Sequence, residues 1–233
     1  MHATRHGEHV VIKLVGKDYR GSVDLLFDLQ QQIPREETHV IPVLDSWLVA
    51  QGTYIVMPRL EPLDECRALP IHTIVSLAQQ LLSGIRFLHQ NKIVHRDLKP
   101  ANIVIDRHRV QLFIIDFDLA ERYEGKDDVE VGFTGSVGFT APEVGEPDYC
   151  KDTTYRMVPA DLWATGKLLN FLVTLSGDIA SIRLNPLKDV ASRMMDRDPS
   201  LRLSADDALA VLIGENKPGV VVRKQAAQPA WTN

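Results

Sequence analysis

The side chains with the greatest chemical capacity in this sequence gather in one octapeptide, residues 95–102, which reads His-Arg-Asp-Leu-Lys-Pro-Ala-Asn. Asp97 carries a carboxylate that can accept a proton from an attacking hydroxyl group. Lys99, two residues later, can neutralise charge on a group in transfer, and Asn102 offers an amide oxygen to a hard cation. This spacing indicates a group-transfer site that combines a base, a cationic side chain and a metal ligand.

A second carboxylate follows a short apolar run, in which Ile114 and Ile115 immediately precede Asp116. The run predicts a buried strand whose end presents Asp116. Magnesium prefers oxygen ligands and keeps several of its waters, so it needs few ligands from the protein when it carries substrate phosphates. Asn102 and Asp116 are therefore the predicted magnesium ligands.

The first third of the chain must position these residues with a small sheet. A run of β-branched residues predicts a strand over 10–15, and two more strands are expected over 39–47 and 53–57. Apolar residues at helical spacing predict a short helix over 22–32, which Pro34 would end.

From residue 70 onward the hydrophobic pattern becomes helical. Apolar residues recur three and four apart over 71–90, which predicts an amphipathic helix, whereas 159–175 is apolar nearly all round and predicts a buried one. Ser204 is the expected N-cap of a last helix that ends near residue 213. The predicted fold class is α+β with two lobes, and its parts are a small β-rich lobe over 1–57, a connector over 58–62, a larger helical lobe over 63–213 and a flexible tail over 214–233.

Composition excludes several classes of protein. With 233 residues and 45% hydrophobic residues, the chain can bury a proper core and is not intrinsically disordered. No apolar stretch approaches the ~20 residues of a membrane span, and the net charge of -5 argues against nucleic acid as a partner. Two cysteines, Cys66 and Cys150, do not make a disulfide framework, so we expect an intracellular protein, cytoplasmic or nuclear.

Six motifs in the right order resemble those of the eukaryotic protein kinases of the serine/threonine type. The octapeptide 95–102 resembles the catalytic loop, and Asp116-Phe117 resembles the start of the magnesium-binding motif. The other four are Lys13 after a strand of Val10-Val11-Ile12, Ala141-Pro142-Glu143 at the end of an activation segment, Asp161 to Gly166 in a buried central helix, and Arg202 as the partner of Glu143.

The resemblance implies a role for each matching residue. Asp97 would orient and deprotonate the acceptor hydroxyl, Lys99 would steady the transferring phosphoryl group, and Lys13 would anchor the α- and β-phosphates of ATP. The implied cofactors are ATP and magnesium, and the implied partner is a protein that offers serine or threonine. The residues implied to hold the adenine ring are Val11 and Val104 on its two faces, Met57 as gatekeeper, and Pro58 to Leu60 in the hinge.

The sequence departs from the family pattern around Lys13. Eight residues precede the strand of Lys13, and two strands with their turn need about a dozen, so we expect a truncated small lobe that lacks the glycine-rich loop. Ser22 stands where the family places a helix glutamate, with Asp24 or Asp28 as substitutes only in a shifted register, and Asp118 replaces a glycine after Phe117.

These departures keep two alternatives open. The chain could be a catalytically weak or inactive pseudokinase that acts as a scaffold or allosteric binding module. It could also be a partial product of a longer kinase gene.

For the motif residues without a proposed catalytic role, we expect structural roles. We expect His95 to be a packing residue, and Asp161 and the Glu143–Arg202 pair to serve as scaffold. Arg96 could bind a phosphate on Thr134 or Ser136, or a fixed charge in its place. The candidates for that fixed charge, Asp127, Asp128 and Glu130, are expected in a solvated loop. Residues 176–186 leave little room for the helix with which the family commonly docks protein substrates.

Overall fold

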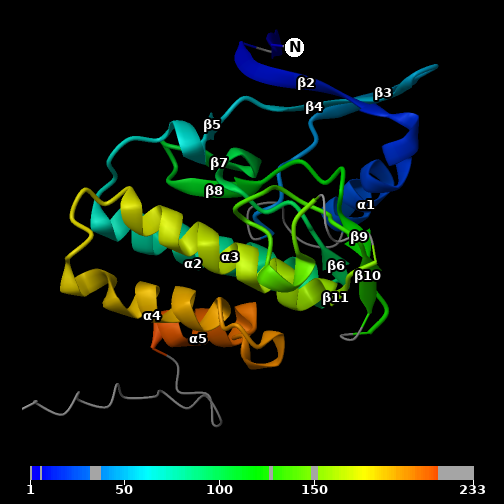
Figure 1. Ribbon diagram of the computed structural model, residues 1–233. Coiled ribbons are helices and arrows are strands. Elements are labelled where there is room, and N and C mark those ends of the chain that lie inside the picture. The colour runs from blue at the N-terminus through cyan, green and yellow to red at the C-terminus, as the bar shows by residue number, and fades with distance from the viewer. Residues whose placement is uncertain (1, 6, 32–37, 126–127, 148–151, 215–233) are drawn as a thin grey trace, which may run out of the picture.

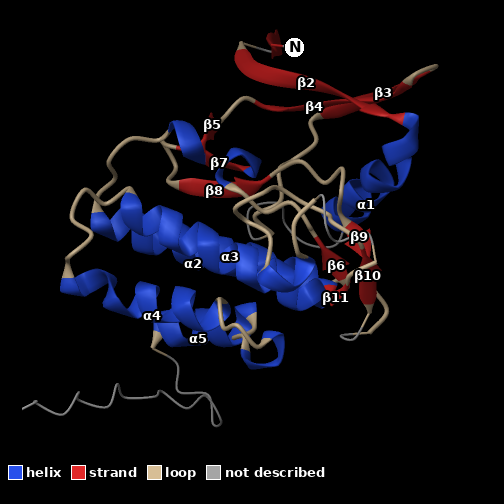
Figure 2. Ribbon diagram, in the orientation of Figure 1, coloured by secondary structure: helices blue, strands red, loops and turns tan. Residues whose placement is uncertain are grey.

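A computed structural model describes every residue of the chain except 1, 6, 32–37, 126–127, 148–151 and 215–233. An antiparallel sheet with one helix lies at one end of the molecule, and a group of long helices lies at the other (Figure 1). Short strands and loops fill the space between these two parts (Figure 2). The arrangement agrees with the predicted α+β fold of a small β-rich part and a larger helical part.

The sheet has four antiparallel strands in the order β1 (His2–Arg5), β2 (Glu8–Gly16), β4 (Gly52–Pro58) and β3 (Asp45–Val49). Val11 of β2 pairs with Met57 of β4, and Lys13 pairs with Ile55. Because side chains alternate along a strand, Val11 and Lys13 lie on the same face of the sheet. That face looks toward the helical part of the molecule, so β2 carries both residues into the space between the two parts.

The expectation that eight residues are too few for a hairpin before Lys13 is wrong in one respect. β1 pairs with β2 along a register from His2 opposite Val11 to Arg5 opposite Glu8. One short strand is enough, because the strand of Lys13 itself forms the second arm of the hairpin. Between His2 and Val11, where the two strands pair, Gly7 is the one glycine among the described residues, so the turn of this hairpin is not a glycine-rich loop.

The predicted strand over 39–47 is also mostly wrong, because β3 begins only at Asp45. The buried residues before it, Val40, Ile41 and Val43, pack into the core instead. Their backbone is satisfied from elsewhere: the Gln30 side chain donates to the Ile41 carbonyl at 3.0 Å and accepts from the Val43 amide at 3.1 Å. The Ile41 amide donates to the Ile114 carbonyl at 3.0 Å, and the Leu44 amide donates to the Val56 carbonyl at 2.7 Å. A helix side chain and isolated backbone contacts thus take the place of a continuous partner strand.

Helix α1 (Arg20–Gln31) covers the sheet face that carries Lys13. It begins two residues before the predicted helix, and the predicted end at Gln32 and Pro34 lies outside the described residues. Its leucines, Leu25, Leu26 and Leu29, are all buried, as helical spacing requires.

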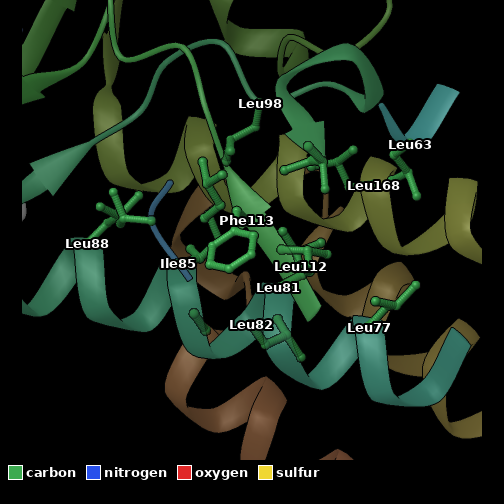
Figure 3. Close-up of a cluster of buried hydrophobic side chains, with 14 of the residues drawn as sticks. Leu63, Leu77, Leu81, Leu82, Ile85, Leu88, Leu98, Leu112, Phe113 and Leu168 are labelled. Atoms are coloured by element: carbon green, nitrogen blue, oxygen red, sulfur yellow. The ribbon is translucent and has the colours of Figure 1, made fainter. Parts of the chain in front are cut away.

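The helical part is built on α2 (Ile71–Gln90) and α3 (Met157–Thr174), which match the predicted helices closely. Leu77, Leu81 and Ile85 of α2 are fully buried, and so is Leu168 of α3. Figure 3 shows these side chains with Leu112 and Phe113 in one cluster between the helices and β8 (Gln111–Ile114). At α3 the core surrounds the helix on nearly all sides, as its sequence predicted.

Two further helices close the helical part. α4 (Asn185–Met194) was not predicted; it packs so closely on α3 that a Cβ on Gly166 would lie 2.9 Å from the Ala191 carbonyl. α5 (Ala205–Ile213) has the predicted N-cap, since the Ser204 hydroxyl accepts from the Asp207 amide. The predicted flexible tail falls, after Gly214, outside the described residues.

Three small sheets hold the loops between the two parts. The first joins β5 (Glu61–Pro62), β7 (Ile103–Asp106) and β8 in that order. The second pairs β6 (Ile93–Val94) with β9 (Glu121–Arg122), and the third pairs β10 (Val129–Val131) with β11 (Thr154–Arg156). Within the described ranges, none of the helices has the length and apolar character needed to cross a bilayer.

Candidate active site

Asp97 lies at the centre of a compact polar network. Its Oδ2 atom accepts from the Lys99 ammonium at 2.7 Å and from the Asn102 amide nitrogen at 3.0 Å. Its Oδ1 atom accepts from the Ser136 hydroxyl at 2.7 Å, and Lys99 also donates to Ser136 at 2.8 Å. Three residues predicted from the octapeptide therefore meet in space. Ser136 joins them from a segment 39 residues further along the chain.

A buried carboxylate fixes the backbone that presents Asp97. Arg96 adopts a left-handed conformation, with φ of +65°, which turns the chain sharply just before Asp97. Asp161 of α3 accepts from the backbone amide of His95 at 2.7 Å and from that of Arg96 at 2.8 Å. Asp161 is therefore scaffold, as expected, and it supports the strained turn directly.

The environment of Asp161 favours its charged form. Burial alone would raise the pKa of this carboxyl group, but the hydrogen bond and charge of His89 and the contacts of His95 outweigh burial and lower it. Asp161 consequently stays ionised and can accept both backbone hydrogen bonds at neutral pH.

His95 is a packing residue, as expected. Its side chain is fully buried, and Nε2 lies 2.9 Å from the Ile115 carbonyl. The ring packs against Phe117 with centroids 5.0 Å apart. His95 thereby ties the segment of Asp97 to the segment that carries Asp116.

Gly135 lets the segment of Ser136 approach Asp97. Its φ of +115° lies outside the range of ordinary side-chain-bearing residues, and a Cβ there would lie 2.7 Å from the Arg96 carbonyl. A larger residue would push Ser136 away from the Asp97 network. Both the backbone conformation and the close packing at position 135 therefore require a glycine.

Lys13 extends from β2 to the other acidic segment. Its Nζ atom lies 2.5 Å from Asp116 Oδ1 and 2.8 Å from Asp118 Oδ1. Burial alone would lower the pKa of Lys13, but the hydrogen bonds and charges of the two carboxylates outweigh it and raise the pKa. Lys13 therefore remains a cation at the edge of the site.

No carboxylate of α1 takes part in this pairing. Ser22, at the position expected for a glutamate, donates its hydroxyl hydrogen bond to the Tyr19 carbonyl at 2.6 Å. Asp24 is exposed, and Asp28 pairs with Arg122 of β9 at 2.7 Å. The sequence expectation that a shifted register could bring Asp24 or Asp28 to Lys13 is therefore not met.

The two acidic centres adjoin each other because β7 and β8 pair. The Ile115 amide donates to the Asn102 carbonyl at 3.0 Å, so Asp116 follows directly after the residue opposite Asn102. Asn102 uses its amide nitrogen for Asp97, which leaves its amide oxygen for another partner. Asp116 has a left-handed φ of +66°, so the backbone leaves the extended conformation of the strand at this residue.

The donor set fits magnesium. Among the described residues no group of three or more histidine, cysteine or acidic side chains could hold a metal ion by itself. Asn102 and Asp116 supply an amide oxygen and a carboxylate, which suit a hard cation that takes its remaining ligands from water and phosphate.

An apolar cavity of about 570 Å³ opens beside β2 and β4. Its lining includes all the residues predicted to hold an adenine ring, namely Val11, Met57, Pro58, Leu60 and Val104. Sequence reasoning missed other lining residues, among them His9, Ile41, Glu61 and Ile115. Ile41 and Ile115 could have been found only by knowing that the chain around them packs beneath the sheet.

The contacts of Arg96 show that Glu130 does not lie in the solvated loop that was expected from the sequence. Its guanidinium donates to Glu130 of β10, and it also lies 2.8 Å from Glu121. Glu130 is thus a fixed negative charge bound to Arg96 and not part of a solvated loop. The strand pairing of β10 with β11 explains the difference, because it holds Glu130 opposite Tyr155. Asp128 accepts from the Glu124 amide instead, and Asp127 lies outside the described residues.

The predicted Glu143–Arg202 pair is present and bidentate, with distances of 2.5 and 2.8 Å. The Arg202 side chain is fully buried and also donates to the Pro159 carbonyl. This pair anchors the end of the segment that carries Ser136.

Cys66 is buried, and burial raises the pKa of its thiol, which does not favour a nucleophile. Cys150 lies outside the described residues.

Comparisons with known proteins agree with this geometry. The family model described as "Protein kinase domain" matches residues 2–180. Myosin light chain kinase 3 of Pongo abelii is 31% identical over 178 residues, which cover 65% of this chain and 21% of that protein. Myosin light chain kinase family member 4 of Mus musculus is 32% identical over 63% of this chain and 42% of that protein.

A third relative covers more of the chain. The phosphorylase b kinase gamma catalytic chain, liver/testis isoform, of Mus musculus is 29% identical over 73% of this chain and 49% of that protein. The matched region thus spans about a fifth to about a half of the length of these relatives. Because the family model matches most of the chain and the site has the expected residues in contact, the chain belongs to the protein kinase family.

Proposed function

We propose that this domain transfers the γ-phosphoryl group of ATP to serine or threonine hydroxyls of a protein. The observation that carries the proposal is the network around Asp97, in which a carboxylate, an ammonium and a hydroxyl meet within hydrogen-bonding distance. Such a catalyst works by positioning and charge stabilisation, and this network supplies both.

Asp97 is the proposed proton acceptor. In the transfer, a bond forms between the acceptor oxygen and the γ-phosphorus, and the bond from that phosphorus to the bridging oxygen of ADP breaks. The hydroxyl proton passes to the Asp97 carboxylate. Lys99, 2.7 Å from Asp97, would offset negative charge on the moving phosphoryl group.

Lys13 is the proposed anchor for the α- and β-phosphates, since it is a cation that extends from β2 into the site. Asn102 and Asp116 are the proposed ligands of magnesium. When bound, this ion supplies neutralising charge at the phosphate oxygens. The binding of ATP with magnesium would also release Lys13 from part of its pairing with Asp116.

The cavity lined by Val11 and Val104 is the proposed adenine site. Its size and apolar walls suit a flat heterocycle, and the hinge residues Pro58 and Leu60 would contribute the Pro58 carbonyl and the Leu60 amide. Met57, which also lines the cavity, is the proposed gatekeeper. We also propose the division into two lobes at the connector 58–62, because this stretch joins the end of β4 to the helical part.

Ser136 supports a serine or threonine acceptor. Its hydroxyl binds both Asp97 and Lys99, so it holds the base and the ammonium in register for an aliphatic hydroxyl. The proposed partner is accordingly a protein with an accessible serine or threonine. The low cysteine count supports the further proposal of an intracellular site of action, in the cytoplasm or nucleus.

The proposal is tested by calorimetric titration with ATP, with and without magnesium, followed by phosphotransfer assays on protein panels. The Asp116→Asn variant should lose the magnesium-dependent part of binding. The Asp97→Asn variant should keep ATP binding but lose about a hundredfold or more of the phosphotransfer rate. Asp178→Asn, an exposed aspartate in the helical part, is the matched control and should change neither quantity.

Two outcomes would favour the alternatives. Binding of ATP without phosphotransfer to any panel member would favour a pseudokinase that acts as a scaffold or allosteric module. Absence of binding at millimolar ATP would contradict the kinase function for this chain and would leave both a scaffold and a partial product of a longer gene as alternatives.

A further inference from the structure

Lys13 has two acidic partners, and both come from the segment after β8. Asp116 and Asp118 place carboxylate oxygens 2.5 and 2.8 Å from its ammonium. The three side chains are between about a quarter and two fifths exposed, so the contacts are shielded from water but not sealed from a ligand. A cation that must later bind phosphates is thus held by two anions of one loop.

Helix α1 offers no substitute for these anions. Ser22 lines the same small cavity as Lys13 and Asp118, so this position of the helix does face the lysine. Its side chain carries no charge, and its hydroxyl is engaged with the Tyr19 carbonyl. Asp28, the acidic residue further along α1, is paired with Arg122.

The two aspartates differ in what else they must do. Asp116 is the proposed magnesium ligand, and a carboxylate that binds a divalent cation holds an ammonium less strongly. Asp118 has no such second task in the proposed mechanism. Its backbone also avoids the left-handed region that Asp116 occupies, so an aspartate fits at position 118 without the strain that would favour glycine.

We propose that Asp118 is the positioning residue of Lys13. Its carboxylate holds the ammonium toward the phosphates of ATP while Asp116 binds the cation, and it does so from the loop because α1 supplies no acidic side chain. The inference rests on the proposed function and deepens it. Because Asp118 acts through Lys13, its contribution to nucleotide binding disappears when Lys13 is removed.

A double-mutant cycle on ATP affinity tests this dependence. The chain, Asp118→Asn, Lys13→Met and the double variant are titrated with ATP and magnesium in a calorimeter. Asp118→Asn should weaken ATP binding about tenfold, the equivalent of one charge-assisted hydrogen bond. The double variant should bind no more weakly than Lys13→Met. Asp28→Asn, which removes an equal charge from α1, is the control and should bind ATP as the unsubstituted chain does.

A spectroscopic readout without nucleotide makes the test independent of activity. In a chain labelled with ¹⁵N-lysine, the ammonium signal of Lys13 is assigned by its loss in Lys13→Met. We expect Asp118→Asn to shift this signal and Asp28→Asn to leave it in place. Asp118→Gly, the residue that the family usually carries, serves as the second variant, and thermal unfolding verifies that each variant is folded.

Two results would overturn the inference alone. The first is unchanged ATP affinity in Asp118→Asn, with an unshifted Lys13 signal, while the unsubstituted chain binds ATP. The second is a further loss of affinity when Asp118→Asn is added to Lys13→Met, because Asp118 would then act on the cation or the phosphates directly. If the unsubstituted chain bound no ATP, the proposed function would fail, and the inference would fail with it.

Discussion

Replacement of Asp161 by asparagine should destabilise the protein and distort the turn that presents Asp97. The two carboxylate oxygens accept from the backbone amides of His95 and Arg96 at 2.7 and 2.8 Å. An asparagine of the same shape has one oxygen and one NH₂ group. Whichever way its amide turns, one buried backbone N–H must face another donor.

The cost follows from these contacts. A buried N–H without an acceptor costs about 2 kcal/mol, and the loss of charge at the remaining hydrogen bond adds about 1 kcal/mol. The expected loss of unfolding free energy is thus about 3 kcal/mol. That is a substantial share of the total of about 5–15 kcal/mol typical of domains.

Urea unfolding of the chain and of Asp161→Asn measures this loss. With a denaturant dependence of about 2 to 3 kcal/mol per M, the midpoint should fall by about 1 M. The exposed Asp178→Asn is the control for removal of a charge as such. A loss below about 1 kcal/mol in Asp161→Asn would refute the reasoning, because the two backbone hydrogen bonds would then not depend on the carboxylate.

Three further predictions concern charged groups that the fold holds in place. The pKa of Asp161 lies below that of an unfolded aspartate, so its stabilising charge is present above about pH 4 and is lost as the pH falls through the folded-state pKa. The stability gap between the chain and Asp161→Asn should therefore narrow from about pH 6 to about pH 3 in urea unfolding, and a constant gap would contradict the shift. Glu143→Gln leaves the fully buried Arg202 guanidinium without its anion and should cost about 3 kcal/mol in the same assay, with an unchanged midpoint as the contrary result. Glu130→Gln removes one of the two carboxylates that contact Arg96 and should lower the phosphotransfer rate about fivefold, the equivalent of ~1 kcal/mol, whereas an equal rate would show that Arg96 does not need this partner.

Most of the fold was predictable where the hydrophobic pattern is long and regular. The helix over 71–90 has the predicted bounds, and the helices near 159–175 and 204–213 differ by a few residues at most. The segment over 39–47 was mispredicted because its β-branched residues look like a strand. Its backbone is instead satisfied by the Gln30 side chain of the preceding helix and by the end of β8, which lies about seventy residues further along the chain.

The residues of the candidate site also differ in how well they could be predicted from the sequence. The octapeptide 95–102 carries its chemistry in adjacent positions, so Asp97, Lys99 and Asn102 are identifiable from residue types and spacing alone. The partners from distant segments could not be assigned so firmly. Glu130 was one of three acidic candidates for Arg96, and only the pairing of β10 with β11 selects it.

Residue types at short, fixed spacings were enough to predict the family, the α+β class and the residues with catalytic capacity. Which charges meet, in contrast, depends on how distant segments pack. Lys13 lies more than a hundred residues before Asp116 and Asp118, and only the packing of the sheet over the helical part places their charged atoms within 2.8 Å. Electrostatic attraction falls steeply with distance and with exposure to water, so the partner of a charge is set by the folded geometry and not by its position along the chain.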